Sequence, residues 1–258
     1  MSATRKILLA GESWVIQTTH IKGIDFFTQW GYGTGEKWIK QAIEQAGISV
    51  RHMPSHEAIE HFPSSVEALR EYDCLILSDI GTNTLLLHPD TTSRSLTTPN
   101  RLEVIERYIS EGGALIMIGG YMSFQGIEGK ARYADTPVER ALPVSLMKTD
   151  DRVEMPQGYS PRVARPEHPV MHGLPREDWP VLLFYNRVIA KPQAEVLMEY
   201  QGDPILAVWN YGQGRAAAFT PDAAPHGAPP KFLEWEYFPT LWHQLVGWLT
   251  KSNAAQIT

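Results

Sequence analysis

The sequence has little cysteine, no excess of basic residues and no long apolar run. A single cysteine, Cys74, occurs in 258 residues, which excludes an internal disulfide framework, fits a reducing compartment and predicts a cytoplasmic protein. Lys and Arg number 23 against 29 Asp and Glu, for a formal net charge of −6. Since no Lys/Arg stripe reverses this balance, we expect no nucleic-acid partner. No segment has the length of a membrane span and no signal-peptide hydrophobic region follows Met1, so we expect no membrane partner.

Metal-ligating patterns are also missing. Three histidines fall between residues 52 and 61, and His168 and His172 are four residues apart. Pro169 and Gly173 argue against a helix that would hold the latter pair on one face. Without a His-Glu-x-x-His motif or a cysteine pair, we expect no metal, and no cofactor is indicated.

The feature that organises the chain is the apolar run over residues 112–124. It is entered through Gly112-Gly113 and left through Gly119-Gly120, as is typical of a strand buried on both faces. The segment 101–111 before it has helical spacing, so the two predict one unit of an open parallel sheet. The glycine turn then presents residues 121–123 above the carboxyl end of the strand, where ligands bind in such sheets.

The same strand–helix alternation extends along the chain and predicts an α/β fold. A segment of about twenty residues after the first strand is expected to be a functional loop, because long irregular loops are uncommon in compact domains. Residues 87–99 are expected to form a surface excursion. Without a linker or repeat, the sequence predicts one domain over 1–258. We expect strands at 6–10, 48–53, 73–79, 113–118, 181–184, 186–190, 195–200, 205–209 and 215–220, and helices at 36–46, after Ser64 or Ser65, at 101–111, 137–141 and 237–249.

Several of these segments together resemble the class I glutamine amidotransferase-like superfamily. The resemblance is carried by the strand order, the turn at 119–123, the connector 168–175 and the hairpin at 212–215. Residues 11–14 and 20–23 are similar to the branch of putative glutamine amidotransferases, near the trehalose-utilisation-like proteins. The resemblance implies a flavodoxin-like three-layer α/β/α sandwich with a mostly parallel central sheet.

It also implies positions for a catalytic triad, and the chain departs from two of them. Tyr121 occupies the place of the nucleophilic cysteine, residues 78–83 match the oxyanion-hole loop, and His226 is the candidate histidine. Gly227-Ala228 follows His226 where the superfamily has Pro-Glu. Thioester chemistry needs a thiolate of lowered pKa, whereas the pKa of a tyrosine is about 10. We therefore expect a degenerate triad without ordinary glutaminase activity.

Each candidate side chain has two interpretations. Tyr121 and Ser123 could form a replacement nucleophile pair, or Tyr121 could cover the pocket while Ser123 caps a helix. His226 could act as a base over the edge of the sheet or only bond to backbone. Cys74, inside a predicted strand, is expected to be inert.

A ligand pocket is expected around residues that follow the first, third and last parallel strands. Their polar side chains could orient a small molecule, or they could serve as caps and core packing. The candidate pocket residues are Glu12, Ser13, Trp14, Asp79, Asn83 and Asp222.

Three functional hypotheses follow. The first is binding of a small polar metabolite; the second is a hydrolase or isomerase that uses His226 as base with Ser123 or Tyr121. A hydroxyl within hydrogen-bond reach of His226 would favour the second. The third is an oligomeric interaction module, in which the many aromatic residues cover a surface between copies. Trp14, Trp30 and Trp38 crowd into one early segment, where they could line such an interface or pack in the core. A large exposed apolar patch would favour the third hypothesis.

Overall fold

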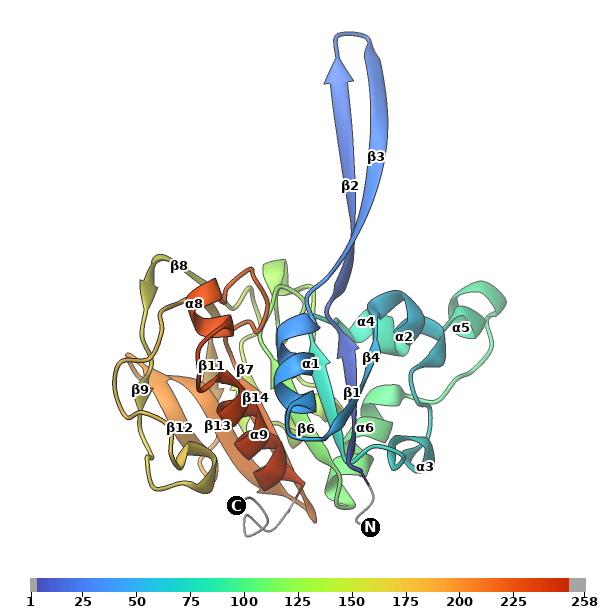
Figure 1. Cartoon of the computed structure of the whole chain (residues 1–258). Coiled ribbons are helices and arrows are strands. Elements are labelled where there is room, and N and C mark those ends of the chain that lie inside the picture. Colours follow the sequence, from blue (N-terminus) through green and yellow to red (C-terminus); the bar gives the residue numbers. More distant parts are fainter. Residues whose placement is uncertain (1–3, 251–258) are drawn as a thin grey trace.

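An eight-stranded sheet forms the centre of the structure, a computed structural model that describes residues 4–250 (Figure 1). The strand order is β4-β1-β5-β6-β14-β13-β12-β9. The first five strands pair in parallel and the last three pair antiparallel. The predicted, mostly parallel sheet is therefore confirmed. The strands are β1 (Lys6–Gly11), β4 (Ser49–Met53), β5 (Cys74–Ser78), β6 (Ala114–Ile118), β14 (Gly214–Phe219), β13 (Asp203–Tyr211), β12 (Glu195–Tyr200) and β9 (Arg162–Val163).

Helices cover both faces of this sheet. Ile7 and Leu9 of β1 belong to one apolar core, while Leu8 and Ala10 belong to the other, because successive side chains of a strand point to opposite faces. The first core is closed by α1 (Lys37–Glu44) and α9 (Phe238–Leu249). The second is closed by α2 (Ser55–His61), α3 (Val66–Leu69), α4 (Thr82–Leu86), α6 (Arg101–Ser110) and α7 (Pro137–Ala141). The fold is thus the expected flavodoxin-like three-layer α/β/α sandwich, and burial on both sides explains the apolar strands.

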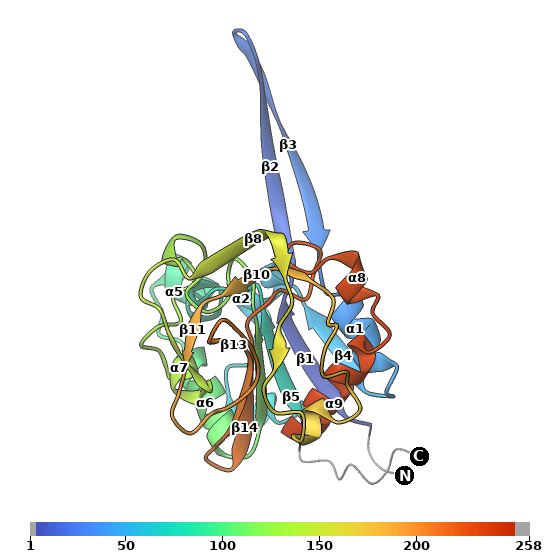
Figure 2. The same cartoon turned by 90° about the vertical axis from the view of Figure 1, so that its left-hand side faces the viewer.

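Smaller elements decorate this frame. Strand β8 (Arg152–Tyr159) pairs with β10 (Leu182–Asn186), and β7 (Val144–Leu146) pairs with β11 (Val188–Ala190). In Figure 2, β8 runs across the top of the body. The predicted surface excursion contains α5 (Pro89–Arg94), and the remaining helices are η1 (Ile127–Gly129), η2 (Pro169–Met171) and α8 (Pro230–Leu233). The helix expected near Ser64 begins at Val66, because the Ser65 Oγ accepts the Ala68 N–H at 3.2 Å.

The loop expected after the first strand is instead a long antiparallel hairpin, so that prediction is wrong. Strands β2 (Ser13–Lys22) and β3 (Asp25–Thr34) pair along their whole length, from Ser13–Thr34 to Lys22–Asp25. We call residues 13–34 the ribbon; it projects from the body in both views (Figures 1 and 2). Its Thr-, Val-, Ile- and aromatic-rich composition suits strands, but apolar residues on both faces obscured the alternation.

Within residues 4–250, no helix combines the length and the apolar character that a membrane span would need.

Candidate functional site

The carboxyl ends of β1, β5, β6 and β14 meet at one edge of the sheet. Strand β1 is the topological switch point of the sheet, because β4 lies on one side of it and β5 on the other. Ligands bind at such a switch point in open α/β sheets. The residues that follow these four strands are Glu12, Asp79, the turn 119–123 and Asp222.

Glu12 is a buried carboxyl held between two strands. Its Oε1 accepts the Ser78 Oγ–H at 2.5 Å, and the side chain is only 2% exposed. Burial raises the pKa of Glu12 well above its ordinary value, and the charges of Asp222 and Asp79 raise it further. The backbone of Glu12 is left-handed, with φ of 47°. The preceding Gly11 must be glycine, because a Cβ there would lie 1.9 Å from the Ser78 carbonyl oxygen.

Asp79 links the end of β5 to the turn after β6. Its Oδ1 accepts the Met122 N–H at 2.7 Å, and its own N–H donates to the Ser123 Oγ at 3.0 Å. Burial raises the pKa of Asp79, against the opposing effect of the Met122 N–H. Like Glu12, Asp79 has positive φ, 46°, a conformation that is concentrated at functional sites. Ser123, 2% exposed, thus serves to hold this backbone.

His226 and Asp222 form a hydrogen-bonded pair on the loop after β14. The distance from His226 Nδ1 to Asp222 Oδ2 is 3.0 Å. This hydrogen bond raises the pKa of His226, although partial burial opposes the effect. A carboxylate can only accept, so the neutral ring carries its proton on Nδ1 and leaves Nε2 as a free base.

Tyr121 packs against His226 through its ring rather than its hydroxyl. The two ring centroids are 4.2 Å apart, edge to face. The hydroxyl of Tyr121 donates to Glu154 Oε1 at 3.1 Å, and the Arg152 guanidinium lies 5.1 Å from the ring centre. In the described part of the chain, neither Tyr121 nor Ser123 forms a hydroxyl hydrogen bond with His226.

Two buried side chains that the sequence analysis missed position the turn after β6. Asn186 at the end of β10 accepts the Gly120 N–H at 3.0 Å and donates to Asp151 Oδ1 at 2.7 Å. Asp151 accepts the N–H groups of Gln125 and Gly126 at 2.8 and 2.9 Å. The available signal was an asparagine within the apolar run of β10, since a buried polar side chain needs partners.

Of the three remaining expected pocket residues, Trp14 lies near Glu12, since both side chains border Gly35, whereas Asn83 and Ser13 do not join the group. Asn83 is exposed on α4. Ser13 is buried, but its Oγ accepts the Ser55 N–H at 2.7 Å and so joins β2 to α2. Trp14 lies at the base of the ribbon, where its indole covers Gly33.

Cys74 lies within β5, between β1 and β6, and is fully buried. Burial raises the pKa of its thiol, and the thiol donates to the Leu75 carbonyl at 3.6 Å. In the described range 4–250, no group of three or more His, Cys, Asp or Glu side chains is arranged to hold a metal.

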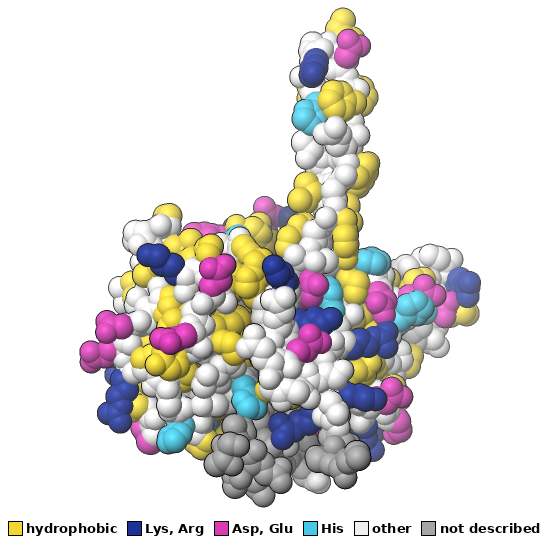
Figure 3. Space-filling view, viewed as in Figure 1, with side chains coloured by type: hydrophobic (Ala, Val, Ile, Leu, Met, Phe, Trp, Pro, Cys, Tyr) yellow, Lys and Arg dark blue, Asp and Glu magenta, His cyan; other side chains and the backbone are white. Residues whose placement is uncertain are grey.

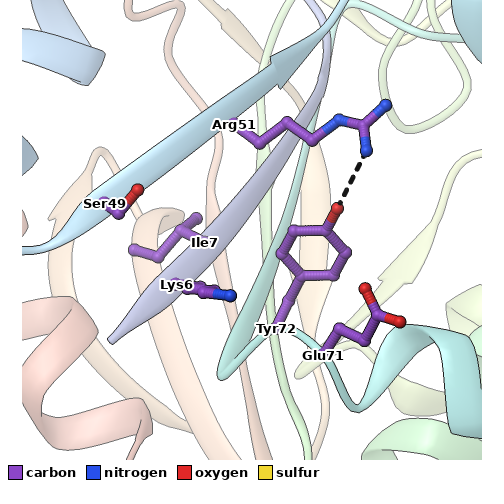
Figure 4. Close-up of a pocket in the computed structure, with 6 residues that line it drawn as sticks. All are labelled: Lys6, Ile7, Ser49, Arg51, Glu71 and Tyr72. Carbon is purple, nitrogen blue, oxygen red and sulfur yellow. Dashed lines mark hydrogen bonds between the residues drawn. The ribbon is translucent and has the colours of Figure 1, made fainter. Parts of the chain in front are cut away.

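A separate pocket opens at the opposite edge, near the amino ends of β1 and β4 (Figure 4). Its volume is about 210 Å³, and Arg51 crosses it to donate to the Tyr72 hydroxyl at 3.4 Å. It contains none of the predicted site residues; its lining is Lys6, Ile7, Ser49, Arg51, Glu71 and Tyr72.

The three-layer sandwich with its mostly parallel sheet is that of a class I glutamine amidotransferase-like protein. Within that class, the chain belongs to the family described as putative glutamine amidotransferase, whose model matches residues 6–251.

Solved structures agree with this assignment. The chain is 42% identical to the cytoplasmic protein STM1381 of Salmonella typhimurium LT2, covering 95% of this chain and 99% of that one, with a TM-score of 0.90. It is 40% identical to the cytoplasmic protein STM3548 of Salmonella typhimurium, covering 94% and 98%, with a TM-score of 0.91. A ThuA-like protein of Bacteroides uniformis, 14% identical over 97% and 93% of the two chains, shares the fold with a TM-score of 0.52. No curated protein matches the sequence.

Proposed function

We propose that the carboxyl edge of the sheet binds a small polar metabolite and does not perform ordinary glutaminase chemistry. The observation that carries the proposal is Tyr121, which stands against His226 where a thiol would be required. The chain's one thiol, Cys74, lies inside the sheet with a raised pKa, and thioester formation needs the opposite properties. The proposed location is the cytoplasm, in keeping with the single cysteine and the two Salmonella relatives.

The chemistry of the edge favours a ligand that donates hydrogen bonds. Glu12, Asp79 and Asp222 bring three carboxyl groups together, and their mutual repulsion contributes to the raised pKa of Glu12. Carboxylates and the free Nε2 of His226 are acceptors. Hydroxyl-rich or amino-bearing molecules therefore fit the site, whereas an anion would be repelled.

Binding is tested by titrating the protein with polyols, aldoses and amino alcohols, and with dicarboxylates of similar size. We expect a neutral or cationic probe to raise the melting temperature by several degrees at saturation. The Asp79→Asn variant should lose this response. The matched control is Asp73→Asn at the opposite edge, where the carboxylate accepts the Lys6 N–H at 2.8 Å; it should keep the response.

Glutaminase activity is tested by ammonia release from glutamine. We expect no release above the rate without protein. Sustained turnover, or stabilisation by dicarboxylates in preference to neutral probes, would overturn the proposal.

A second candidate function rests on the His226–Asp222 pair. An imidazole oriented by a carboxylate, with a free Nε2, can act as a general base in a hydrolase or isomerase. The absence of a Ser123 or Tyr121 hydroxyl on His226, among the described hydrogen bonds, favours binding over a protein nucleophile. In the base mechanism the nucleophile would therefore be water.

The base mechanism is tested with activated esters such as p-nitrophenyl acetate. If it operates, His226→Gln should abolish catalysed hydrolysis, and Asp222→Asn should lower the pKa of the rate profile, because it removes the hydrogen bond that raises the pKa of His226. Equal rates in the wild type and His226→Gln would exclude it.

A further inference from the structure

The ribbon has one predominantly apolar face. Cross-strand partners share a face of a sheet and successive residues alternate between faces. The register of β2 and β3 therefore sorts the ribbon side chains into two sets. We call the first set the aromatic face: Val15, Gln17, Thr19, Ile21, Phe26, Thr28, Trp30 and Tyr32. The opposite face carries Trp14, Ile16, Thr18, His20, Lys22, Asp25, Phe27, Gln29, Gly31 and Gly33.

The aromatic face is open to solvent. Its large side chains are exposed to 62% at Val15, 76% at Ile21, 73% at Phe26, 67% at Trp30 and 56% at Tyr32. Figure 3 shows apolar side chains following the projecting ribbon. At 150–250 Å² for a full aromatic side chain, these exposures leave on the order of 700 Å² of apolar surface. A patch of this size marks an interaction surface.

Among the described strands, no further one joins the ribbon to stabilise it. Strands β2 and β3 pair only with each other among the described strands. A two-stranded hairpin alone is at best marginally stable in water and needs a further layer on its apolar face. The exposed area is close to the roughly 800 Å² that each partner contributes to a standard interface.

The order of residues along the aromatic face is self-complementary. From base to tip, the cross-strand pairs are Val15–Tyr32, Gln17–Trp30, Thr19–Thr28 and Ile21–Phe26. Apolar pairs therefore stand at both ends, and the two threonine Oγ1 atoms, 3.3 Å apart, lie near the middle. When a second copy is related to the first by a two-fold rotation, its Ile21–Phe26 pair lies over the Val15–Tyr32 pair of the first copy. This is the requirement for an isologous interface.

We propose that the aromatic face binds the same face of a second copy of this chain, so that two ribbons form the core of a dimer. The ribbon's only charged side chains are Lys22 and Asp25, which cancel and lie on the opposite face. An anionic membrane surface or a nucleic acid would find no basic cluster there. The interface does not depend on the metabolite proposed for the sheet edge.

The first test is the mass in solution, measured by sedimentation equilibrium over a range of concentrations. We expect the wild type to have twice the chain mass of 29.0 kDa. The double variant Ile21→Thr/Phe26→Thr should raise the dimer Kd at least about tenfold, because it removes two anchors of the interface. The matched control Ile16→Thr/Phe27→Thr makes the same changes on the opposite face and should change the Kd less than about twofold.

The second test uses single cysteines that barely disturb the ribbon. Thr19→Cys lies near the centre of the proposed interface, and Thr18→Cys lies at the same height on the opposite face. With a short bis-maleimide, Thr19→Cys should give a cross-linked dimer and Thr18→Cys should not. The native Cys74 does not interfere because it is fully buried.

Three outcomes would overturn the proposal. The first is a wild type that remains monomeric at about 100 μM, a concentration at which an interface of standard size should be occupied. The others are equal weakening of the dimer by the two double variants, and ribbon-dependent binding of a monomer to neutral lipid vesicles.

Discussion

At the scale of single residues, the unusual feature is a carboxyl group kept in the interior. Glu12 is held by one hydroxyl hydrogen bond from Ser78 and lies near two further carboxylates. A buried, unpaired charge is costly, so the protein keeps the proton on this group to a higher pH than water would. The carboxyl groups at the sheet edge therefore repel one another, and a ligand with several hydrogen-bond donors would reduce this electrostatic strain.

This strain predicts how stability depends on pH. Below the ordinary pKa of 4.5, Glu12 is protonated in both states and has no effect. As pH rises above that value, the unfolded chain releases the proton while the folded chain retains it, so Glu12 lowers stability progressively until its raised pKa is passed. The Glu12→Gln variant should therefore become more stable relative to the wild type as the pH rises above 4.5. The difference in the free energy of unfolding should grow by about 1.4 kcal/mol for each tenfold by which folding raises the proton affinity of Glu12. The melting temperatures of the two proteins between pH 4.5 and 8 measure this gain.

The control for this prediction is Glu44→Gln, which removes a negative charge from the exposed surface of α1. It should show no growing advantage with pH. A difference between Glu12→Gln and the wild type that stays constant over the same range would show that Glu12 is not the source of the strain.

At the scale of elements, the turn after β6 is positioned by groups far away in the sequence. Gly120 is held by Asn186, and the backbone of residues 125 and 126 by Asp151. Asp79 holds the opposite side through Met122. The direction of Tyr121 over His226 is thus set by three residues remote in sequence: Asp79 after β5, Asp151 before β8 and Asn186 at the end of β10.

Removing the asparagine should loosen this turn. Asn186→Ala leaves the Gly120 N–H without its partner in the interior and removes one of the two donors to Asp151 Oδ1, which keeps the Gly126 N–H. We expect a loss of about 2–3 kcal/mol in the free energy of unfolding, measured by urea denaturation. Asn210→Ala, which removes an exposed hydrogen bond with Arg215, is the control and should cost less than about 1 kcal/mol. Similar losses in both variants would contradict the role of Asn186.

The ribbon shows the limit of reading elements from local patterns. Its composition is typical of strands, yet the sequence predicted a loop. Alternation is visible only when one face is polar, and Trp14, Ile16 and Phe27 place apolar groups on the second face as well. Only the strand register in the structure separates the two faces.

At the scale of the whole molecule, the position of Cys74 reports on the integrity of the sheet. The residue lies in β5, between β1 and β6, with both faces covered by helices. Since its burial raises the thiol pKa, we expect reagents such as iodoacetamide to react with Cys74 only through global unfolding.

The labelling rate should therefore fall at least about a thousandfold below that of the urea-unfolded chain. It should rise with urea along the same curve as the loss of the native far-UV circular dichroism signal. Fast labelling of the native protein would mean that the Cys74 thiol is accessible and able to act as a nucleophile.

The sequence by itself determined the sheet and the edge at which the candidate site lies. Buried strands such as 114–118 are continuous apolar runs, and glycines mark their ends. The carboxyl ends of parallel strands lie at the same edge of the sheet. Glu12, Asp79, Tyr121 and His226 could therefore be assigned to one edge from order alone. They lie at one edge because the strands are parallel, and the alternation of strand and helix segments in the sequence indicates parallel strands.

Only the tertiary structure decided which of these groups touch. The contact of Ser123 with Asp79 and the hydrogen bond between Asn186 and Gly120 depend on distances between segments remote in sequence. The hydrogen bond between His226 and Asp222, four residues apart, depends on the conformation of the loop after β14. The same is true of Asn83, which follows β5 as Asp79 does but lies exposed on α4. Hydrogen bonds form over about 3 Å, whereas sequence patterns place a residue only to within an element, so the chemistry of the edge was fixed by packing.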